Sequence, residues 1–215
     1  MLCIFDLDGT LVDSLEDLRE ATEYALFQLK LPGYPLDKYR LFVGDGVKML
    51  LLRALGPKHT HLYKEARSYF DEYYAVHCLD HTDLYPYINQ CIHHLTLKGI
   101  KVAVYTNKPD YLAKKIVNSL FDCEFTFIQG QTNLYPVKPD PSFLNDYFTT
   151  HHVDKEHCIF IGDSDVDIFT SNNVHIKSIG VTWGNREQLE LEQAGATVIV
   201  HNVKDLENKI MEMAI

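Results

Sequence analysis

The chain alternates short apolar runs with longer stretches of helical periodicity. Runs that end in polar turns predict buried strands, and they cover residues 2–5, 100–105, 157–161 and 178–181. Weaker runs predict two further strands, at 125–128 and 197–200. Apolar positions recur at helical spacing over residues 87–98, 109–120, 141–148, 187–193 and 203–213. This alternation predicts an α/β fold, a doubly wound parallel sheet of the Rossmann-like type.

The segment between residues 15 and 82 follows a different pattern. It contains no convincing strand, and its apolar faces predict helices over residues 15–29, 46–55 and 61–79. Proline and glycine interrupt these stretches at Pro32-Gly33 and Gly56-Pro57. We therefore expect a small all-helical domain, residues 15–82, inserted into a catalytic core formed by residues 1–14 and 83–215.

Polar side chains follow the predicted strands at the point where each strand ends. In an open parallel sheet, the carboxyl ends of the strands form the ligand crevice. The residues expected to converge there are Asp6, Asp8, Thr106, Asn107, Lys138, Asp163 and Asp167.

Their chemistry suggests transfer of a phosphoryl group. Clustered carboxylates repel one another unless a cation lies among them, and Mg²⁺ prefers such hard oxygen ligands. Hydroxyl, amide and ammonium groups can donate hydrogen bonds to phosphate oxygens. One carboxylate can attack phosphorus while another moves the protons. The simpler interpretation is that these aspartates form strand-end turns and helix caps.

Four short motifs resemble those of the haloacid dehalogenase superfamily of phosphohydrolases. Residues 5–14 (FDLDGTLVDS) resemble its first motif, and Thr106-Asn107 resembles its second. Lys138-Pro139 resembles the third motif, and residues 162–167 (GDSDVD) resemble the fourth. All four occur in the order of the family across nearly the whole chain, which makes the resemblance specific.

The resemblance implies a role for each matching position. Asp6 would be the nucleophile and a metal ligand, and Asp8 the general acid/base with its backbone carbonyl on the metal. Asp163 would bind the metal directly, whereas Asp167 would hold it through water or orient a lysine. The helical insert would be a cap that excludes water. Three residues would bind the phosphoryl group: Thr106, Asn107 and Lys138.

Within this superfamily, residues 42–47, 105–109 and 180–184 resemble phosphoglycolate phosphatases. Two stretches depart from the usual pattern, Pro86-Tyr87 and residues 170–174. Gly44 is either an interhelical turn or a site where backbone amides approach the substrate. The other candidate substrate-binding residues are Lys48, Arg53 and Lys108, with Arg186 at the rim.

Composition and charge narrow the choice of partners. The net charge of −10 gives no basic excess of the kind that binds nucleic acid. No apolar run approaches the roughly 20 residues needed to span a bilayer. The five cysteines, Cys3 and Cys158 among them, predict buried free thiols and a cytoplasmic protein. We expect a small phosphorylated metabolite as partner, and the oligomeric state stays open.

The sequence therefore predicts a magnesium-dependent phosphatase. It would hydrolyse a small phosphate monoester, similar to phosphoglycolate, through an aspartyl-phosphate intermediate. A sugar phosphomutase similar to β-phosphoglucomutase or a pyrophosphatase could use the same motifs. A non-catalytic binding module is disfavoured because Asp6 and Asp8 are both present.

Overall fold

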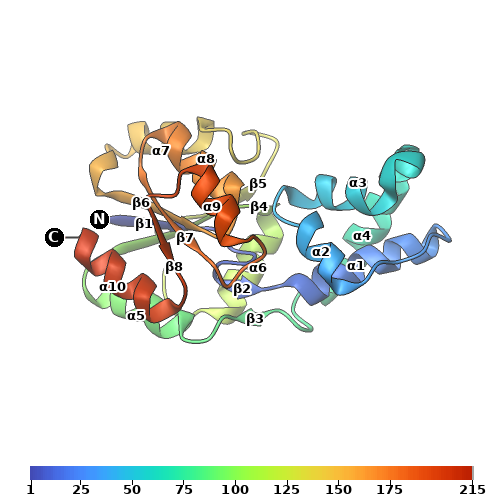
Figure 1. Ribbon diagram of the computed structural model, residues 1–215, viewed down its shortest axis with the longest axis horizontal. Coiled ribbons are helices and arrows are strands. Elements are labelled where there is room, and N and C mark those ends of the chain that lie inside the picture. The colour runs from blue at the N-terminus through green and yellow to red at the C-terminus, as the bar shows by residue number, and fades with distance from the viewer. Residues whose placement is uncertain (215) are drawn as a thin grey trace.

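The computed structural model describes residues 1–214 and shows two lobes of unequal size (Figure 1). The larger lobe carries the N-terminus at its far end, and the smaller lobe contains helices α1 to α4 and a short 3₁₀ turn. Over residues 1–214, no helix combines the length and the apolar character needed to cross a membrane.

The larger lobe is built on six parallel strands in the order β5-β4-β1-β6-β7-β8. The strands are β1 (Leu2–Phe5), β4 (Lys101–Pro109), β5 (Ile128–Gln131), β6 (Cys158–Gly162), β7 (Lys177–Val181) and β8 (Val198–Val200). The helices are α5 (Ile88–Leu97), α6 (Asp110–Leu120), α7 (Ser142–Thr150), α8 (Asp165–Val174), α9 (Gln188–Ala194) and α10 (Val203–Met213), with a 3₁₀ turn at Lys155–His157. The predicted α/β sheet is confirmed.

Alternation along β1 divides the core into two layers. Cys3 and Phe5 pack on one face of the sheet with apolar residues of α5, α6 and α10. Leu2 and Ile4 pack on the other face with residues of α7 and α8. Both faces are buried, which explains why the parallel strands are continuous apolar runs in the sequence.

The smaller lobe packs its helices around a second apolar cluster. Its elements are α1 (Leu15–Gln28), α2 (Leu36–Phe42), α3 (Gly46–His59), a 3₁₀ turn (Thr60–Leu62) and α4 (Tyr63–His77). Leu26 of α1, Leu55 of α3 and Ala66 of α4 meet in this cluster. The helical geometry of α3 is interrupted at Gly56, whose φ is 66°. The sequence analysis ended the predicted helix at the residue before it.

Helix α2 and strand β5 differ from the predictions in ways that the sequence pattern explains. Helix α2 was not predicted, because its seven residues are too few to show a clear helical period. The strand predicted at residues 125–128 is β5, which begins only at Ile128 and runs to Gln131. Phe127 precedes the strand, and its ring packs against Phe143 at 5.5 Å between centroids.

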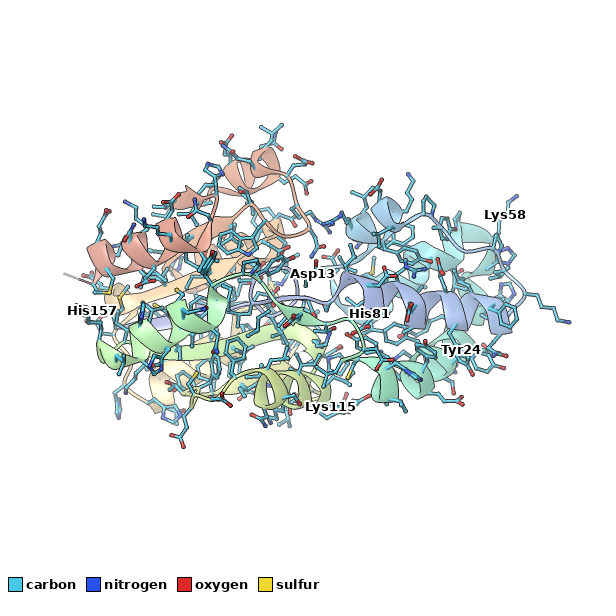
Figure 2. The ribbon with its side chains drawn as sticks, turned by 90° about the horizontal axis from the view of Figure 1, so that it is seen from below. Asp13, Tyr24, Lys58, His81, Lys115 and His157 are labelled. Atoms are coloured by element: carbon cyan, nitrogen blue, oxygen red, sulfur yellow. The ribbon has the colours of Figure 1, made fainter. Side chains whose placement is uncertain are left out.

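A two-stranded antiparallel sheet and a buried carboxylate join the lobes. Strands β2 (Val12–Asp13) and β3 (Asp83–Leu84) pair antiparallel where the chain leaves and re-enters the larger lobe. Figure 2 shows Asp13 and His81 at this narrow junction. The division into a core of residues 1–14 and 83–215 and a cap of residues 15–82 stays a prediction. Strands β2 and β3 lie at the two boundaries of that division.

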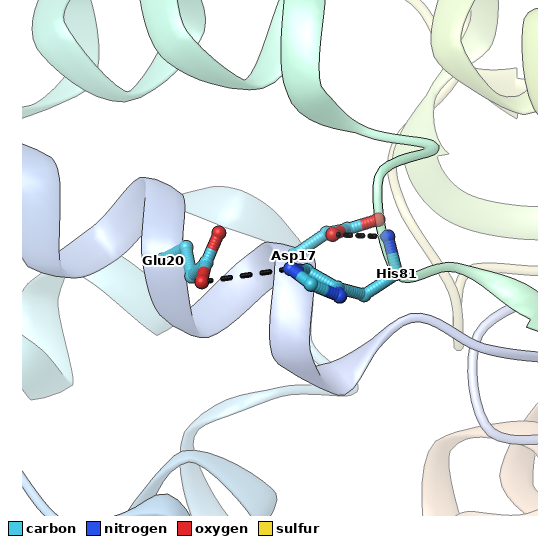
Figure 3. Close-up of side chains that lie close together, drawn as sticks. All are labelled: Asp17, Glu20 and His81. Carbon is cyan, nitrogen blue, oxygen red and sulfur yellow. Dashed lines mark hydrogen bonds and ion pairs between the residues drawn. The ribbon is translucent and has the colours of Figure 1, made fainter.

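Asp17, at the start of α1, holds the segment through which the chain returns from the smaller lobe to the larger one. Its carboxylate accepts a hydrogen bond from the backbone N–H of His81 at 2.9 Å (Figure 3). It accepts another from the backbone N–H of Thr82 at 2.8 Å. The Thr82 hydroxyl donates to the same carboxylate at 2.6 Å. Glu20 and His81 complete a group close enough to surround an ion, but both oxygens of Asp17 already accept hydrogen bonds.

Candidate active site

Three aspartates from separate parts of the chain converge at the carboxyl edge of the sheet. Asp6 follows β1, Asp163 follows β6, and Asp167 lies in the first turn of α8. The closest carboxylate oxygens of the three lie within 4.8 Å of one another, and all three side chains are buried. The structure thus brings together the predicted nucleophile and two of the predicted metal ligands.

Lys138 lies between two of these carboxylates. Its ammonium is 2.8 Å from Asp6 Oδ1 and 2.6 Å from Asp167 Oδ1. Burial disfavours the charged ammonium, but the carboxylates of Asp167 and Asp6 outweigh burial and raise the pKa of Lys138. Asp167 is itself fixed, since its Oδ2 accepts hydrogen bonds from Ser164 N and Ser164 Oγ. This geometry favours the role in which Asp167 orients Lys138.

The carboxyl groups are crowded in a way that suits a divalent cation. Burial, opposed by the Lys138 ammonium, raises the pKa of Asp6 to about 6. Burial and the neighbouring Asp167 and Asp6 carboxylates raise the pKa of Asp163 to about 7. Asp6 Oδ1 is buried and faces the Lys138 ammonium at 2.8 Å. Three buried carboxylates this close together, two of them with raised pKa values, fit Mg²⁺, which takes oxygen ligands.

Asp8 has different surroundings from Asp6. Lys108 Nζ donates to its two carboxylate oxygens at 2.8 and 3.1 Å, and Ser14 Oγ donates to Oδ1. The same ammonium donates to the hydroxyl of Tyr74, from α4 of the smaller lobe, at 2.7 Å. Burial disfavours the Lys108 ammonium, but Asp8 and Tyr74 outweigh it and raise the pKa of Lys108. The predicted acid/base is thus connected through one lysine to the smaller lobe.

Thr106 and Asn107 both lie where the sequence places them, near the end of β4. Thr106 is buried and lines the pocket, and its hydroxyl accepts a hydrogen bond from Lys108 N at 3.3 Å. The side chain of Asn107 accepts from Lys138 N at 2.8 Å and donates to Lys138 O at 3.3 Å. Asn107 therefore holds the loop that carries the catalytic lysine candidate, a role that the motif alone does not show.

A pocket of about 40 Å³ lies between the lobes beside these groups. Its polar wall contains Asp6, Asp8, Thr106, Asn107 and Lys108, and its cap wall contains Leu18, Val43, Gly44, Gly46, Val47 and Leu50. Its volume is close to the space of roughly one water molecule in the liquid. The cap is therefore closed over the site, and the pocket in this form is too small for a phosphate ester.

The structure brings only some of the cap candidates to the pocket. Gly44 lines it with a φ of 107°, and its carbonyl accepts a hydrogen bond from Asn107 at 3.4 Å. Lys48 is exposed and does not line the pocket. Arg53 also lies outside, where it donates to Phe42 O at 2.9 Å and pairs with Asp45. Both side chains face away because α3 presents its apolar face to the site.

Two contributors were not identified from the sequence. Asn185 donates to Asp163 Oδ2 from its backbone N at 2.7 Å and from its side chain at 3.2 Å. Tyr74 was interpreted as cap core, and it is buried, but its hydroxyl reaches Lys108. A polar residue directly after the Thr182-Trp183-Gly184 turn was the available signal for Asn185, since that turn also follows a strand.

Comparisons with known proteins agree with this geometry. A model of the haloacid dehalogenase-like hydrolase family matches residues 3–181. The chain is 30% identical over 213 residues to phosphoglycolate phosphatase 1 of Pseudomonas aeruginosa, covering 95% of this chain and 78% of that protein. It is 33% identical over 193 residues to a phosphoglycolate phosphatase of Vibrio cholerae, covering 85% of this chain and 84% of that protein. A crystal structure of a candidate phosphoglycolate phosphatase from Lactobacillus delbrueckii subsp. bulgaricus has a TM-score of 0.92 and 31% identity, covering 97% of each chain.

Proposed function

Because this chain belongs to the haloacid dehalogenase-like hydrolase family, we propose that it is a magnesium-dependent phosphatase acting through an aspartyl phosphate on Asp6. The observation that carries the proposal is the convergence of Asp6, Asp163 and Asp167 around Lys138 at one edge of the sheet. Carboxylates crowded in this way support binding of a cation, and that cation together with Lys138 would bind a phosphoryl group beside the nucleophile.

The first half of the reaction forms the phosphoenzyme. A carboxylate oxygen of Asp6 attacks phosphorus, and the bond between phosphorus and the ester oxygen breaks. Asp8 gives a proton to the departing alcohol oxygen. Lys138 stabilises the negative charge that spreads over the phosphoryl oxygens. Asp6, Asp163 and the backbone carbonyl of Asp8 would hold Mg²⁺ while Asp167 orients Lys138, and the ion would neutralise further phosphoryl charge when bound.

The second half regenerates the enzyme. Asp8 takes a proton from water, whose oxygen attacks phosphorus and releases inorganic phosphate from Asp6. Closure of the cap limits the site to few water molecules while the phosphoenzyme forms. The products are one alcohol and one phosphate, and both aspartates return to their starting forms.

We place the substrate among small phosphate monoesters that carry an anionic group, as phosphoglycolate does. Relatives of about 30% identity are named phosphoglycolate phosphatases, and the pocket of the closed form is small. In the lining of that pocket, as described for residues 1–214, Lys108 is the only cationic side chain. A short anionic leaving group suits a pocket with one cation and an apolar cap wall.

The test is release of phosphate from a panel of esters with Mg²⁺, compared with EDTA. The panel contains phosphoglycolate, hexose phosphates, nucleotides and pyrophosphate. Asp6→Asn should lose turnover by at least about 10³-fold while it stays folded, because an amide is not a nucleophile. Asp122→Asn, at an exposed position, is the matched control and should keep normal activity.

Two results would overturn the proposal. Turnover at the wild-type rate in Asp6→Asn would exclude the nucleophile, and equal rates in EDTA and Mg²⁺ would exclude the cation. Conversion of a hexose 1-phosphate to its isomer, without release of phosphate, would instead identify a phosphomutase.

A further inference from the structure

Arg186 is a core residue whose side chain reaches the smaller lobe. It lies between β7 and α9, yet its Nη1 donates to Arg40 O at 2.6 Å and its Nη2 donates to Val43 O at 2.7 Å. The side chain is 9% exposed, which is unusual for arginine unless its donors are used. Glu190 lies 3.6 Å from Nε and balances part of the charge.

The two acceptors lie at the C-terminal end of α2. Carbonyl groups in the last turn of a helix lack partners within the helix, and they favour a nearby cation. Arg53, from within the cap, donates to Phe42 O at 2.9 Å in the same turn. The carbonyls of this turn are thus shared between one arginine of the cap and one of the core. The two hydrogen bonds of Arg186 form only when the cap lies against the core.

The backbone that Arg186 fastens is the wall of the pocket. Val43 and Gly44 both line the cavity over Asp6. Gly44 has a φ of 107°, and a Cβ atom there would lie 3.3 Å from Arg186 Nη2. Glycine at this position therefore lets the guanidinium approach the turn closely.

The same short segment also contacts the cluster of carboxylates. Asn185, next to Arg186 in the chain, donates twice to Asp163 Oδ2, at 2.7 and 3.2 Å. Adjacent residues therefore bind a predicted metal ligand and the cap backbone. A fixed Asn185 leaves little freedom for the start of the Arg186 side chain.

We propose that Arg186 is a positioning residue that fastens the closed cap by holding the backbone of Arg40 and Val43 over the active site. Its effect on turnover rests on the proposed phosphatase function, whereas the closure itself does not. Arg186 touches neither the nucleophile nor the phosphoryl site, so it acts through the position of the pocket wall. Substrate enters when these two hydrogen bonds break, and the pocket is complete when they form again.

Hydrogen exchange measured by mass spectrometry tests the fastening without any turnover. In Arg186→Gln, amides of residues 40–46 should exchange about tenfold faster than in the wild type, the factor expected for one lost charge-assisted hydrogen bond. Amides of α4 should exchange as before. Arg186→Lys should lie between the two, because one ammonium cannot serve both carbonyls in the planar geometry of arginine. Arg67→Gln, which breaks an ion pair within α4, is the matched control.

Steady-state kinetics with phosphoglycolate, or with whichever ester of the panel is turned over, then tests the consequence. Arg186→Gln should lower kcat/KM about tenfold, with partial rescue in Arg186→Lys and a normal value in Arg67→Gln. Unchanged exchange at residues 40–46 in folded Arg186→Gln would overturn the proposal, as would an equal loss of kcat/KM in Arg67→Gln. If Arg186→Gln fails to fold, Arg186→Lys carries the same comparison with the same two outcomes. Altered exchange without activity on any ester would reject the phosphatase function and keep the fastening.

Discussion

Asp6 and Asp163 have raised pKa values in the folded protein, about 6 and about 7 against an ordinary value of 3.8. At pH values between 3.8 and these raised pKa values, the folded state therefore holds protons that the unfolded state has released. For these groups, stability in the absence of metal is greatest below pH 4 and is lost as the pH rises through 6 and 7. We expect the metal-free protein to gain on the order of 1–3 kcal/mol between pH 8 and pH 6.

Urea denaturation in EDTA at pH 6 and pH 8 measures this difference. Because Mg²⁺ binds the ionised carboxylates, added Mg²⁺ should stabilise the protein more at pH 8 than at pH 6. Asp163→Asn should flatten the dependence on pH, since its amide does not titrate. Lower stability at pH 6 than at pH 8 in EDTA would contradict the buried-carboxylate interpretation.

Lys108 controls the position of Asp8 through a bidentate contact of 2.8 and 3.1 Å. In Lys108→Met, Asp8 loses this partner, so we expect kcat to fall about 10²-fold, the lower range for loss of acid/base catalysis. Tyr74→Phe removes only the second contact of the ammonium and should have a smaller effect. Lys114→Met, which breaks an exposed ion pair with Asp110, is the control.

Steady-state kinetics at saturating Mg²⁺ separate two roles of Lys108. A fall in kcat with little change in KM supports the positioning of Asp8. A rise in KM with normal kcat would mean that the main role of Lys108 is to bind the leaving group, as the sequence analysis expected.

Among single residues, the sequence predicts those whose position follows from a local motif. Asp6 and Asp163 each follow an apolar run, so their place at the sheet edge follows from the strand pattern alone. The Lys108–Tyr74 contact joins residues 34 positions apart across two lobes, and no periodicity encodes it. Arg53 was predicted at the pocket because of its charge, but the orientation of α3 turns it toward Asp45.

Among the elements, helix α1 begins with a contact that holds the returning connection between the lobes, residues 81 and 82. Asp17 is buried and accepts two backbone hydrogen bonds and one hydroxyl bond from residues 81 and 82. Asp17→Ala would leave the Thr82 N–H buried without its partner. We expect it to lower the free energy of unfolding by about 2–4 kcal/mol, since hydrogen bonds to charged groups exceed ordinary ones.

Glu20→Gln provides the matched comparison for urea denaturation. Glu20 lies on the same helix and approaches His81 at 3.7 Å, but that pair is exposed. Its loss should cost less than about 0.5 kcal/mol. Equal destabilisation by the two substitutions would show that the hydrogen bonds of Asp17 to residues 81 and 82 contribute no more than an exposed ion pair.

The bounds of helices were predicted closely where the apolar face in the sequence was long and regular. Helix α5 (Ile88–Leu97) and helix α10 (Val203–Met213) lie within one residue of their predicted bounds. Helix α2 was missed because Pro35 and Val43 leave only seven residues between them. Strand β5 begins at Ile128, although the residues just before it already bond to β4: Thr126 N donates to Val102 O at 2.7 Å, and Phe127 O accepts from Val104 N at 2.9 Å.

Across the whole molecule, polar side chains of the larger lobe bind the cap at several points. Lys108 reaches Tyr74 at 2.7 Å, and Lys115 of α6 donates to the backbone carbonyl of Ala75 at 2.8 Å. Arg186 holds the α2 end on the other side. Tyr74 and Ala75 are neighbours on α4, so that helix is fastened from two core elements. The sequence predicts that a cap exists, but these contacts depend on how the lobes meet.

A pocket of about 40 Å³ obliges the lobes to separate for each substrate that enters and each product that leaves. If this motion limits turnover, kcat of the wild type should fall in proportion to solvent viscosity when sucrose is added. A polymer that raises only the bulk viscosity should have little effect. Lys108→Met, in which the chemical step is slowed, should lose most of the dependence, because cap motion is then faster than the reaction. A wild-type kcat that is independent of sucrose would place the slow step in the chemistry, with the cap opening rapidly on that timescale.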